Sequence, residues 1–459
     1  LETKNVTPSS RQNVEFSVSD AGEYRIKIEF NGYVCYTKTV TVTVSECTHP
    51  GITGENKCTQ CHCDIAATVT SGTVTTGYAD IADALAAAQT QNGCTLKLLA
   101  DVDKTLLVRS GNFTIDAAGR TFGGNFNVQK GVVLTVEAAG TVFSGKIVCA
   151  KGAQLTVNGG TVKGAVNAVG TANFTDTTFE STVSGHSEMT LTKCVLKGNL
   201  SASGIVRAET CTLSADATAL KDGELHLSGG SYCSITANTD SKLFIYSGSF
   251  TGTVKAVAGS NVTVYNGGIY DLLAESGSKL TIENGLFTTV LIQANTDATL
   301  TGGYFSNITV VGKRLMDCLG EGCAYAEDST GTVIDGRVGI AGGVHIITDH
   351  THECVWKTST HEKLCGCGFV EETDLDAPTF SGIADGDIYG DTTFTVNDDN
   401  DFTVALDGEP FEPTLGKYRL IADNQPHTLV ATDIAGNVRT LTVTAWKLYR
   451  VTLPSGTGY

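Results

Sequence analysis

The sequence predicts an all-β protein whose centre is a right-handed parallel β-helix, with a helical N-terminal cap and a β-sandwich on either side. Three observations predict this fold class. An internal repeat of 17 to 19 residues runs through 155–305. The stretch 63–377 contains no proline, which would remove a hydrogen-bond donor from a strand ladder. Segments of alternating apolar and polar residues lie before and after this stretch.

Nine copies of the repeat align on an apolar first position. Another apolar residue follows two positions later, and a bulky, mostly apolar residue follows seven positions later. A spacing of two is the strand period and places both side chains on one face. Turn pairs such as Asn284-Gly285 between them favour a sharp corner. The first positions are Leu155, Ala172, Met189, Val206, Leu225, Leu243, Val262, Leu280 and Ala298.

One copy cannot bury its apolar face alone, so the copies must stack. With a looser copy at Leu134, about ten coils at a strand spacing of about 4.8 Å predict a rod of roughly 48 Å. No sustained six-residue period, which is typical of left-handed solenoids, is present. We assign residues 64–349 to the β-helix and its caps.

The composition excludes several classes of partner. The chain has 459 residues, enough for several domains. Its formal net charge of −18 disfavours nucleic acid and anionic membranes. No apolar run reaches the length of a membrane span, so we expect no membrane insertion. Low charge content and 52 glycines suit an extracellular β protein, which we expect to be a monomer.

Residues 1–46 predict the C-terminal part of a β-sandwich. Alternation in 25–30 and 36–44 surrounds a hairpin turn at Asn31-Gly32. The segment Asp20-Ala-Gly-Glu-Tyr24 resembles the D-x-G-x-Y corner of immunoglobulin-like domains. Two residues after Tyr24 that family usually has Cys, whereas this chain has Ile26, so no inter-sheet disulfide is implied.

Residues 47–63 form a linker rich in Cys and His. Two close pairs of donors separated by a Gly-containing loop suit a tetrahedral structural zinc. Cys63 and His62 are spare donors, and the alternative is one or two disulfides, such as Cys47–Cys58 and Cys61–Cys63. The second of these would close a strained ring, so we favour the metal. The predicted ligands are Cys47, His49, Cys58 and Cys61.

The clearest helix in the sequence covers residues 79–89. Asp80 can cap its N-terminus, and one face is apolar through Ile81, Ala84, Leu85 and Ala88. A helix at this place would cover the open end of the solenoid, where exposed strand edges invite aggregation.

The chain has 15 cysteines, an odd number, which argues against a framework made only of disulfides. Cys194 and Cys211 occupy the same position in adjacent coils, so they are predicted to lie one above the other. They could form a disulfide or remain a ladder of small buried thiols. Cys318 and Cys323 could close a small loop.

Residues 350–373 form a second Cys/His linker, after the β-helix. A structural zinc or disulfides would both stabilise it, and the sequence leaves the choice open. Cys354 and His350 are reserve ligands, and Trp356 is expected to pack over the site. The predicted ligands are His352, His361, Cys365 and Cys367.

Residues 374–446 predict a complete small sandwich, with turn pairs at Asp385-Gly386 and Asp407-Gly408. Residues 447–459 predict the first strand of a further, truncated module.

The order of these parts resembles modular cell-wall surface proteins of gut clostridial bacteria. The resemblance is carried by residues 80–88, by coils such as Leu300-Thr-Gly-Gly-Tyr-Phe305, by the 352–368 cluster and by Ala431-Thr-Asp-Ile-Ala-Gly-Asn-Val438. It implies that 374–446 is a bacterial immunoglobulin-like domain and that the protein is displayed outside the cell. Some proteins of this build resemble immunoglobulin-binding superantigens, so immunoglobulin is one candidate ligand.

The leading functional hypothesis is a non-catalytic surface adhesin that binds a host protein or glycan. The alternatives are a carbohydrate-active β-helix enzyme and a structural spacer. An enzyme would need carboxylates clustered on neighbouring coils. The solenoid carboxylates are predicted to occupy different coil positions, so we expect no catalytic residue; they are Asp176, Asp216, Asp222, Asp240 and Asp271.

Overall fold

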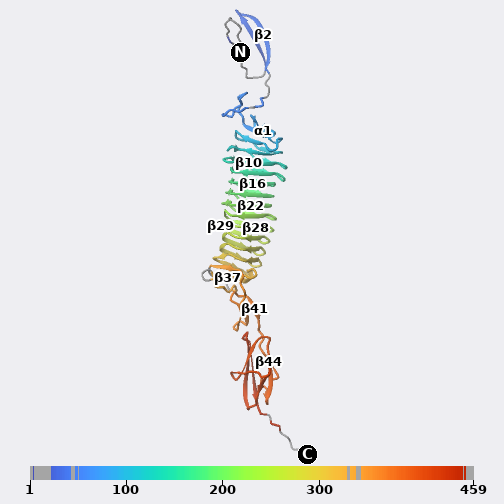
Figure 1. Ribbon diagram of the computed structural model, residues 1–459, viewed down its shortest axis with the longest axis vertical. Helices are drawn as coiled ribbons and strands as arrows, with labels where there is room; N and C mark the ends of the chain where they lie inside the picture. Colours follow the sequence, from blue (N-terminus) through green and yellow to red (C-terminus); the bar gives the residue numbers. More distant parts are fainter. Residues whose placement is uncertain are drawn as a thin grey trace, which may run out of the picture.

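The computed structural model describes residues 4, 22–42, 47–49, 51–327, 331–337, 343–447 and 449–450. Strands account for 52% of it and helices for 3%, which confirms an all-β protein. A β-solenoid of about 12 turns forms the middle of a long rod (Figure 1). Residues 5–21 of the predicted N-terminal sandwich and residues 451–459 of the predicted further module lie outside the described residues. No described helix is long and apolar enough to cross a membrane.

One wall of the solenoid is a sheet of fourteen strands, here called the long sheet. Its strands pair in parallel from β5 onward, whereas β3 pairs antiparallel with both β4 and β5. The strands are β3 (Ala67–Ser71), β4 (Val74–Tyr78), β5 (Thr95–Leu98), β7 (Asn112–Asp116), β10 (Val133–Glu137), β13 (Gln154–Asn158), β16 (Thr171–Thr175), β19 (Glu188–Thr192), β22 (Ile205–Glu209), β25 (Glu224–Ser228), β28 (Lys242–Ile245), β30 (Asn261–Val264), β32 (Lys279–Ile282) and β34 (Asp297–Leu300).

The rest of the coil wall is a sheet of 22 strands, here called the split sheet. Most coils add a two-residue strand and then a three-residue strand, and each stacks on its counterpart in the next coil. The strands are β6 (Leu106–Val108), β8 (Thr121–Phe122), β9 (Phe126–Val128), β11 (Val142–Phe143), β12 (Ile147–Cys149), β14 (Thr161–Val162), β15 (Val166–Ala168), β17 (Thr178–Phe179), β18 (Val183–Gly185), β20 (Val195–Leu196), β21 (Leu200–Ala202), β23 (Thr212–Leu213), β24 (Ala217–Ala219), β26 (Ser231–Tyr232), β27 (Ile235–Ala237), β29 (Ser249–Ala256), β31 (Gly268–Ala274), β33 (Leu286–Ile292), β35 (Tyr304–Phe305), β36 (Ile308–Val310), β37 (Ala324–Glu327) and β38 (Val344–Ile347).

The predicted repeat is the solenoid coil. Leu155 pairs with Ala172, and Ala172 pairs with Met189, so the first positions of successive copies lie directly above one another. All nine first positions, and the residues two and seven places later, are buried. Rings stack between coils, for example Tyr232 on Phe250 with centroids 4.9 Å apart. The period-two alternation therefore builds a continuous core. The structure has about 12 turns, whereas the sequence predicted about ten coils.

The corner of the split sheet changes along the rod. In early coils it contains glycines packed closely against the preceding coil, and a Cβ on Gly145 or Gly164 would clash with that backbone. From Ile269 to Leu272 the corner has one residue fewer than from Phe250 to Val254. The two short strands are joined into one in β29, β31 and β33. The C-terminal third of the solenoid therefore has a differently shaped outer face.

The predicted helix is present as α1 (Ile81–Ala88), between β4 and β5 in sequence. The Asp80 side chain accepts a hydrogen bond of 2.6 Å from the Ala82 N–H, as an N-cap residue should. Ala84, Leu85 and Ala88 are buried within the solenoid core. After the last regular coil, the 3₁₀ turn η1 (Leu315–Cys318) contributes two more buried residues.

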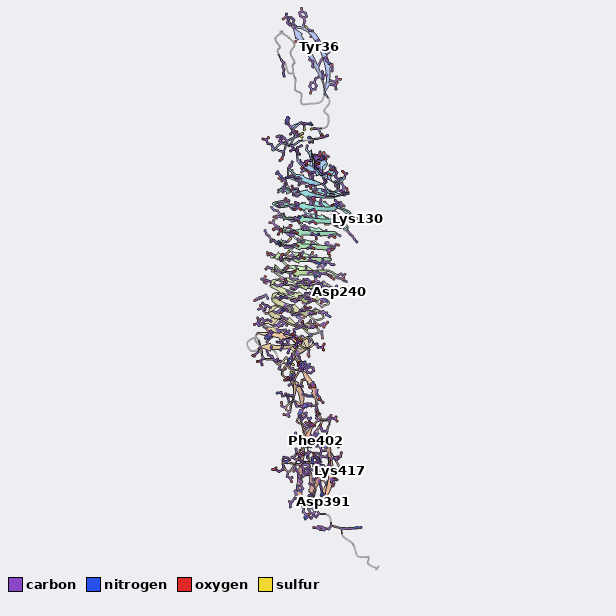
Figure 2. The ribbon with its side chains drawn as sticks, viewed as in Figure 1. Tyr36, Lys130, Asp240, Asp391, Phe402 and Lys417 are labelled. Atoms are coloured by element: carbon purple, nitrogen blue, oxygen red, sulfur yellow. The ribbon has the colours of Figure 1, made fainter. Side chains whose placement is uncertain are left out.

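Smaller β units lie at both ends of the solenoid. Figure 2 shows Tyr36 at the N-terminal end and Phe402, Lys417 and Asp391 at the C-terminal end. The C-terminal unit packs a three-stranded sheet and a five-stranded sheet around one core that includes Phe394. The strands are the hairpin β1 (Gly22–Phe30) and β2 (Tyr33–Val42), the linker sheet β39 (Cys354–Lys357), β40 (Glu362–Cys365) and β41 (Val370–Thr373), the three-stranded sheet β42 (Thr379–Ser381), β44 (Thr392–Asn397) and β47 (Tyr418–Leu420), and the five-stranded sheet β43 (Ile388–Tyr389), β45 (Phe402–Leu406), β46 (Glu409–Pro410), β48 (Gln425–Asp433) and β49 (Val438–Ala445).

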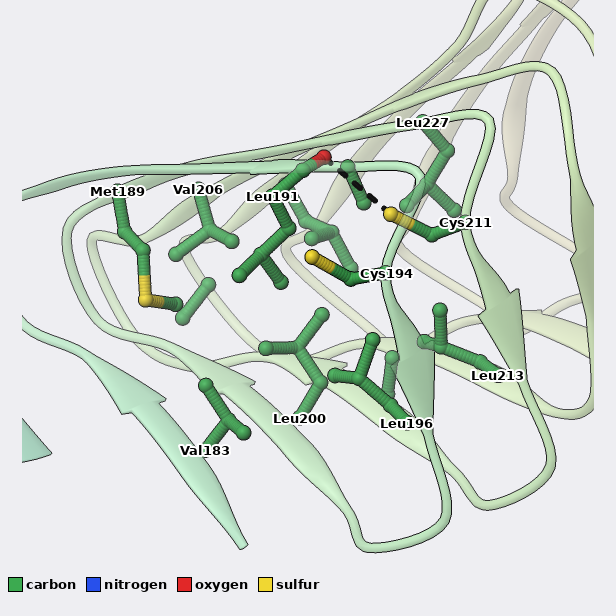
Figure 3. Close-up of a cluster of buried hydrophobic side chains, with 14 of the residues drawn as sticks. Val183, Met189, Leu191, Cys194, Leu196, Leu200, Val206, Cys211, Leu213 and Leu227 are labelled. Carbon is green, nitrogen blue, oxygen red and sulfur yellow. Dashed lines mark hydrogen bonds between the residues drawn. The ribbon is translucent and has the colours of Figure 1, made fainter. Parts of the chain in front are cut away.

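Cys194 and Cys211 point into the solenoid interior from neighbouring coils (Figure 3). Both are free thiols and donate to backbone carbonyls, Cys194 to Phe174 at 3.4 Å and Cys211 to Leu191 at 3.2 Å. A hydrogen bond with Cys211 and burial raise the pKa of Cys194. The pair is therefore a ladder of buried free thiols rather than a disulfide. Cys318 and Cys323 are also free and buried.

We expect Cys194 and Cys211 to react with an aromatic disulfide reagent only after unfolding, because they are 1% and 0% exposed. Replacing both by serine should leave the thiol count of the native protein unchanged and lower the count in guanidinium. Cys35, which is exposed, provides the control, because Cys35→Ser should lower the native count. A native count that falls in the double variant would contradict the buried ladder.

Candidate metal centres

The first Cys/His linker brings its predicted ligands together on a short looped segment. The group consists of Cys47, His49, Cys58 and Cys61, whose donor atoms all lie within 4.8 Å of one another. Backbone hydrogen bonds from Cys58 to Cys63 and from His62 to Cys58, of 2.9 and 3.0 Å, fold the C-terminal pair into a tight turn. Because the segment has little apolar core, these contacts and the ligands are what shape it.

The distances in the first group suit a tetrahedral metal. Cys47 Sγ lies 3.6 Å from Cys58 Sγ, and Cys61 Sγ lies 3.4 Å from His49 Nδ1. A tetrahedral zinc with Zn–S bonds of about 2.3 Å separates two sulfurs by about 3.8 Å, whereas a disulfide bond is about 2.05 Å long. Cys63 is a fifth nearby donor, with its Sγ 3.6 Å from His49 Nδ1. The residues therefore fit a soft metal ion such as zinc.

Hydrogen bonds also give the thiols of this group different pKa values. The backbone N–H of Cys63, followed by the Cys63 thiol, lowers the pKa of Cys61 to about 7. The hydrogen bond with Cys61, followed by burial, raises the pKa of Cys63 to about 11. The backbone N–H of Cys61 likewise lowers the pKa of Cys58. Cysteine binds a metal as the thiolate, so Cys58 and Cys61 are the thiols of this group that ionise, and therefore bind a metal, more easily.

The second group forms where the solenoid meets the linker sheet. Its donors are His350, His352, Cys365 and Cys367. Cys365 Sγ lies 3.4 Å from His350 Nε2, and Cys367 Sγ lies 3.3 Å from His352 Nδ1. Both cysteines are at most 5% exposed, and burial raises the pKa of Cys367 to about 11. This set of two imidazoles and two thiols also fits zinc.

His361 does not join the second group, although the sequence predicted it as a ligand, and the reserve residue His350 is there instead. His361 lies in the turn before β40, and its Nδ1 is 2.9 Å from the Ala435 carbonyl oxygen. Because Glu362–Cys365 is an extended strand, the backbone of His361 lies roughly 13 Å from that of Cys365, at about 3.3 Å per residue. The ring that stacks on His352 is Phe369, at 4.2 Å, rather than Trp356.

Hydrogen bonds and ion pairs fix the second group between the units on either side. The Gly336 N–H donates to the Cys367 carbonyl at 2.9 Å, and the His350 N–H donates to Gly322 at 2.9 Å. Arg337 bridges Asp335 and Glu362, with contacts of 2.9 Å to each. At the far end of the linker sheet, His361 bonds to the C-terminal unit. The second group therefore sits within a joint that contacts both neighbours.

Carboxylates form a third cluster in the C-terminal unit, which the sequence did not predict. Asp374, Asp398 and Asp433 lie together, and amide donors satisfy part of the group. Asn437 donates to both oxygens of Asp433, at 2.8 and 2.9 Å, and Asn400 donates to Asp374 at 2.7 Å.

One expectation about the solenoid carboxylates was wrong. Asp222 and Asp240 share a coil position, because the Asp222 N–H donates to the Asp240 carbonyl at 3.2 Å. Both have positive φ, and Lys221 lies 3.8 Å from the Asp240 carboxylate.

Comparison of the chain with protein-family models, curated proteins and solved structures finds no match.

Proposed function

We propose that this chain is a non-catalytic bacterial surface protein that presents a β-rod to a host ligand. The observation that carries the proposal is the extended solenoid of about 12 turns with β units at both ends (Figure 1). A stack of similar coils gives reach and a repetitive outer face. The resemblance to surface proteins of gut clostridial bacteria supports an extracellular, monomeric protein displayed on the cell wall.

The proposal includes a finer description of the parts. We take the solenoid to be a right-handed β-helix that α1 caps, because Leu85 of this helix joins the solenoid core. We take the C-terminal unit to be a bacterial immunoglobulin-like domain, on the strength of its two sheets around one core. The β1–β2 hairpin would belong to a second domain of this type.

We further propose that both Cys/His groups hold structural zinc. Sulfur and imidazole donors at spacings close to those of a tetrahedral ion support this assignment. Bound zinc would stabilise two linkers that have little core of their own, at either end of the solenoid. The rod would then keep a fixed connection to the neighbouring units.

A non-catalytic role is supported by the pairing of charges on the outer face. Glu224 contacts Lys242 at 2.7 Å, and this hydrogen bond holds the pKa of Glu224 below its usual range. A general acid needs a raised pKa, so Glu224 is suited to holding coils together rather than to proton transfer. Glu188 forms a second ion pair between coils, with Arg207 at 3.1 Å.

Binding to host material tests the proposal. The purified chain should bind saturably to intestinal epithelial cells in flow cytometry, or to purified immunoglobulin on a sensor surface, at near-physiological salt. Failure to bind cells, immunoglobulin and mucin would reject the display role and leave the spacer role. Turnover of an acidic glycan by the purified chain would reject the non-catalytic assignment.

A further inference from the structure

A surface groove crosses four successive coils of the split sheet, on β29, β31, β33 and β35. Its volume is about 390 Å³, within the range of about 300–1,000 Å³ that is usual for ligand sites. The groove lies largely where the two short strands of a coil are joined into one, in β29, β31 and β33. The change in coil shape and the groove therefore occur at the same place on the rod.

Exposed apolar side chains form the walls of the groove, and a glycine without a side chain lies between them. Tyr270 and Leu286 line it and are 61% and 65% exposed. In-register pairing stacks Ser249, Gly268 and Leu286 in one row. A Cβ added to Gly268 would meet nothing within 4 Å, so this glycine leaves a notch between its two neighbours. The groove is thus a recess in an otherwise regular strand face.

The lining combines aromatic rings with hydroxyl groups and contains no charged side chain. Tyr270 and Tyr304 provide the rings, and Ser249, Thr251 and Thr288 provide hydroxyls. Aromatic faces pack against the apolar C–H faces of sugar rings, while hydroxyls exchange hydrogen bonds with sugar hydroxyls. An uncharged groove on a chain of net charge −18 disfavours acidic ligands.

From this lining we infer that the groove binds a neutral oligosaccharide. The inference rests on the proposed display function and names the chemical class of ligand. A folded protein partner fits less well, because stable protein interfaces bury about 800 Å² on each side, and this recess spans only four coils, or roughly 14 Å along the rod. A short glycan segment matches both the size and the chemistry of the recess.

The test uses the whole chain and soluble polysaccharides as probes. Mannan, xylan, galactan and starch are the neutral probes, and polygalacturonate is the acidic one, with binding measured by affinity electrophoresis and calorimetry. Tyr270→Ala removes one wall, and Gly268→Trp fills the notch. Tyr246→Ala is the matched control, because Tyr246 is 42% exposed, stacks on Tyr265 and lies outside the groove.

At least one neutral polymer should retard the unaltered chain, and polygalacturonate should not. Both groove variants should weaken binding about tenfold or more, and the control should bind like the unaltered chain. Circular dichroism checks that the variants keep their strand content. The inference is overturned if no neutral polymer binds, if polygalacturonate binds in its place, or if the groove variants bind like the control.

The results also separate this inference from the proposed function. Host-cell binding that survives in Gly268→Trp would support the display role and reject the groove as its ligand site. Polysaccharide binding that is lost in Gly268→Trp, in a chain that binds no host material, would support the groove and reject the display role.

Discussion

The double variant Cys365→Ser, Cys367→Ser is expected to bind one zinc ion per chain, and the unaltered protein is expected to bind two. These residues supply two of the four donors in the second group. Structural zinc contributes about 10–16 kcal/mol to the folding of small domains. Among the residues that the structure describes, the cluster around this site contains only three buried ones, Ala324, Cys365 and Cys367. Without the metal, we therefore expect the linker sheet to unfold and to be cut by proteases.

Metal analysis by mass spectrometry and limited proteolysis of the whole chain measure these effects. Two histidine variants provide the sharpest comparison. His350→Ala should weaken zinc binding at the second site, whereas His361→Ala should keep both ions, because His361 bonds to the Ala435 carbonyl instead. If His361→Ala weakened zinc binding and His350→Ala did not, the assignment of His350 as a ligand would be rejected. Two tightly bound ions in the double cysteine variant would reject the site altogether.

The solenoid core could be predicted from the sequence because inward positions depend on local spacing. In a strand, residues two apart share a face, so Leu155 and Val157 must point the same way whatever the rest of the chain does. A coil of 17 residues then places Leu155 beneath Ala172. These two rules are enough to locate the buried residues of all nine copies.

The ligands of the second metal group could not all be predicted. The backbone conformation between two donor residues decides whether both can reach the same ion. The three residues between His361 and Cys365 could form a turn or a strand, and only a turn would bring the two together. Pairing of β40 with β39 and β41 makes them a strand. Likewise, the groove lies where the two short strands of a coil join into one strand, and this change leaves the apolar spacing almost unchanged.

Phe179→Ala is expected to lower the free energy of unfolding by about 3–5 kcal/mol, the usual cost of emptying a buried aromatic site. Phe179 is 0% exposed and contacts Phe174 edge to face, with centroids 5.2 Å apart. Phe244→Ala is the matched control on the outer face of the long sheet. Phe244 is only partly buried and stacks on His226 with ring centroids 4.6 Å apart, so we expect a decrease of about 1 kcal/mol.

Urea denaturation followed by circular dichroism measures the two decreases, and hydrogen exchange shows where they act. Since each coil contacts only its neighbours, faster exchange in Phe179→Ala should centre on β14, β17 and β20, which pair through this position. The same substitution removes the same atoms in both variants, so only the direction of the side chain differs. Equal losses of stability would mean that the inner and outer faces of the coil had been assigned incorrectly.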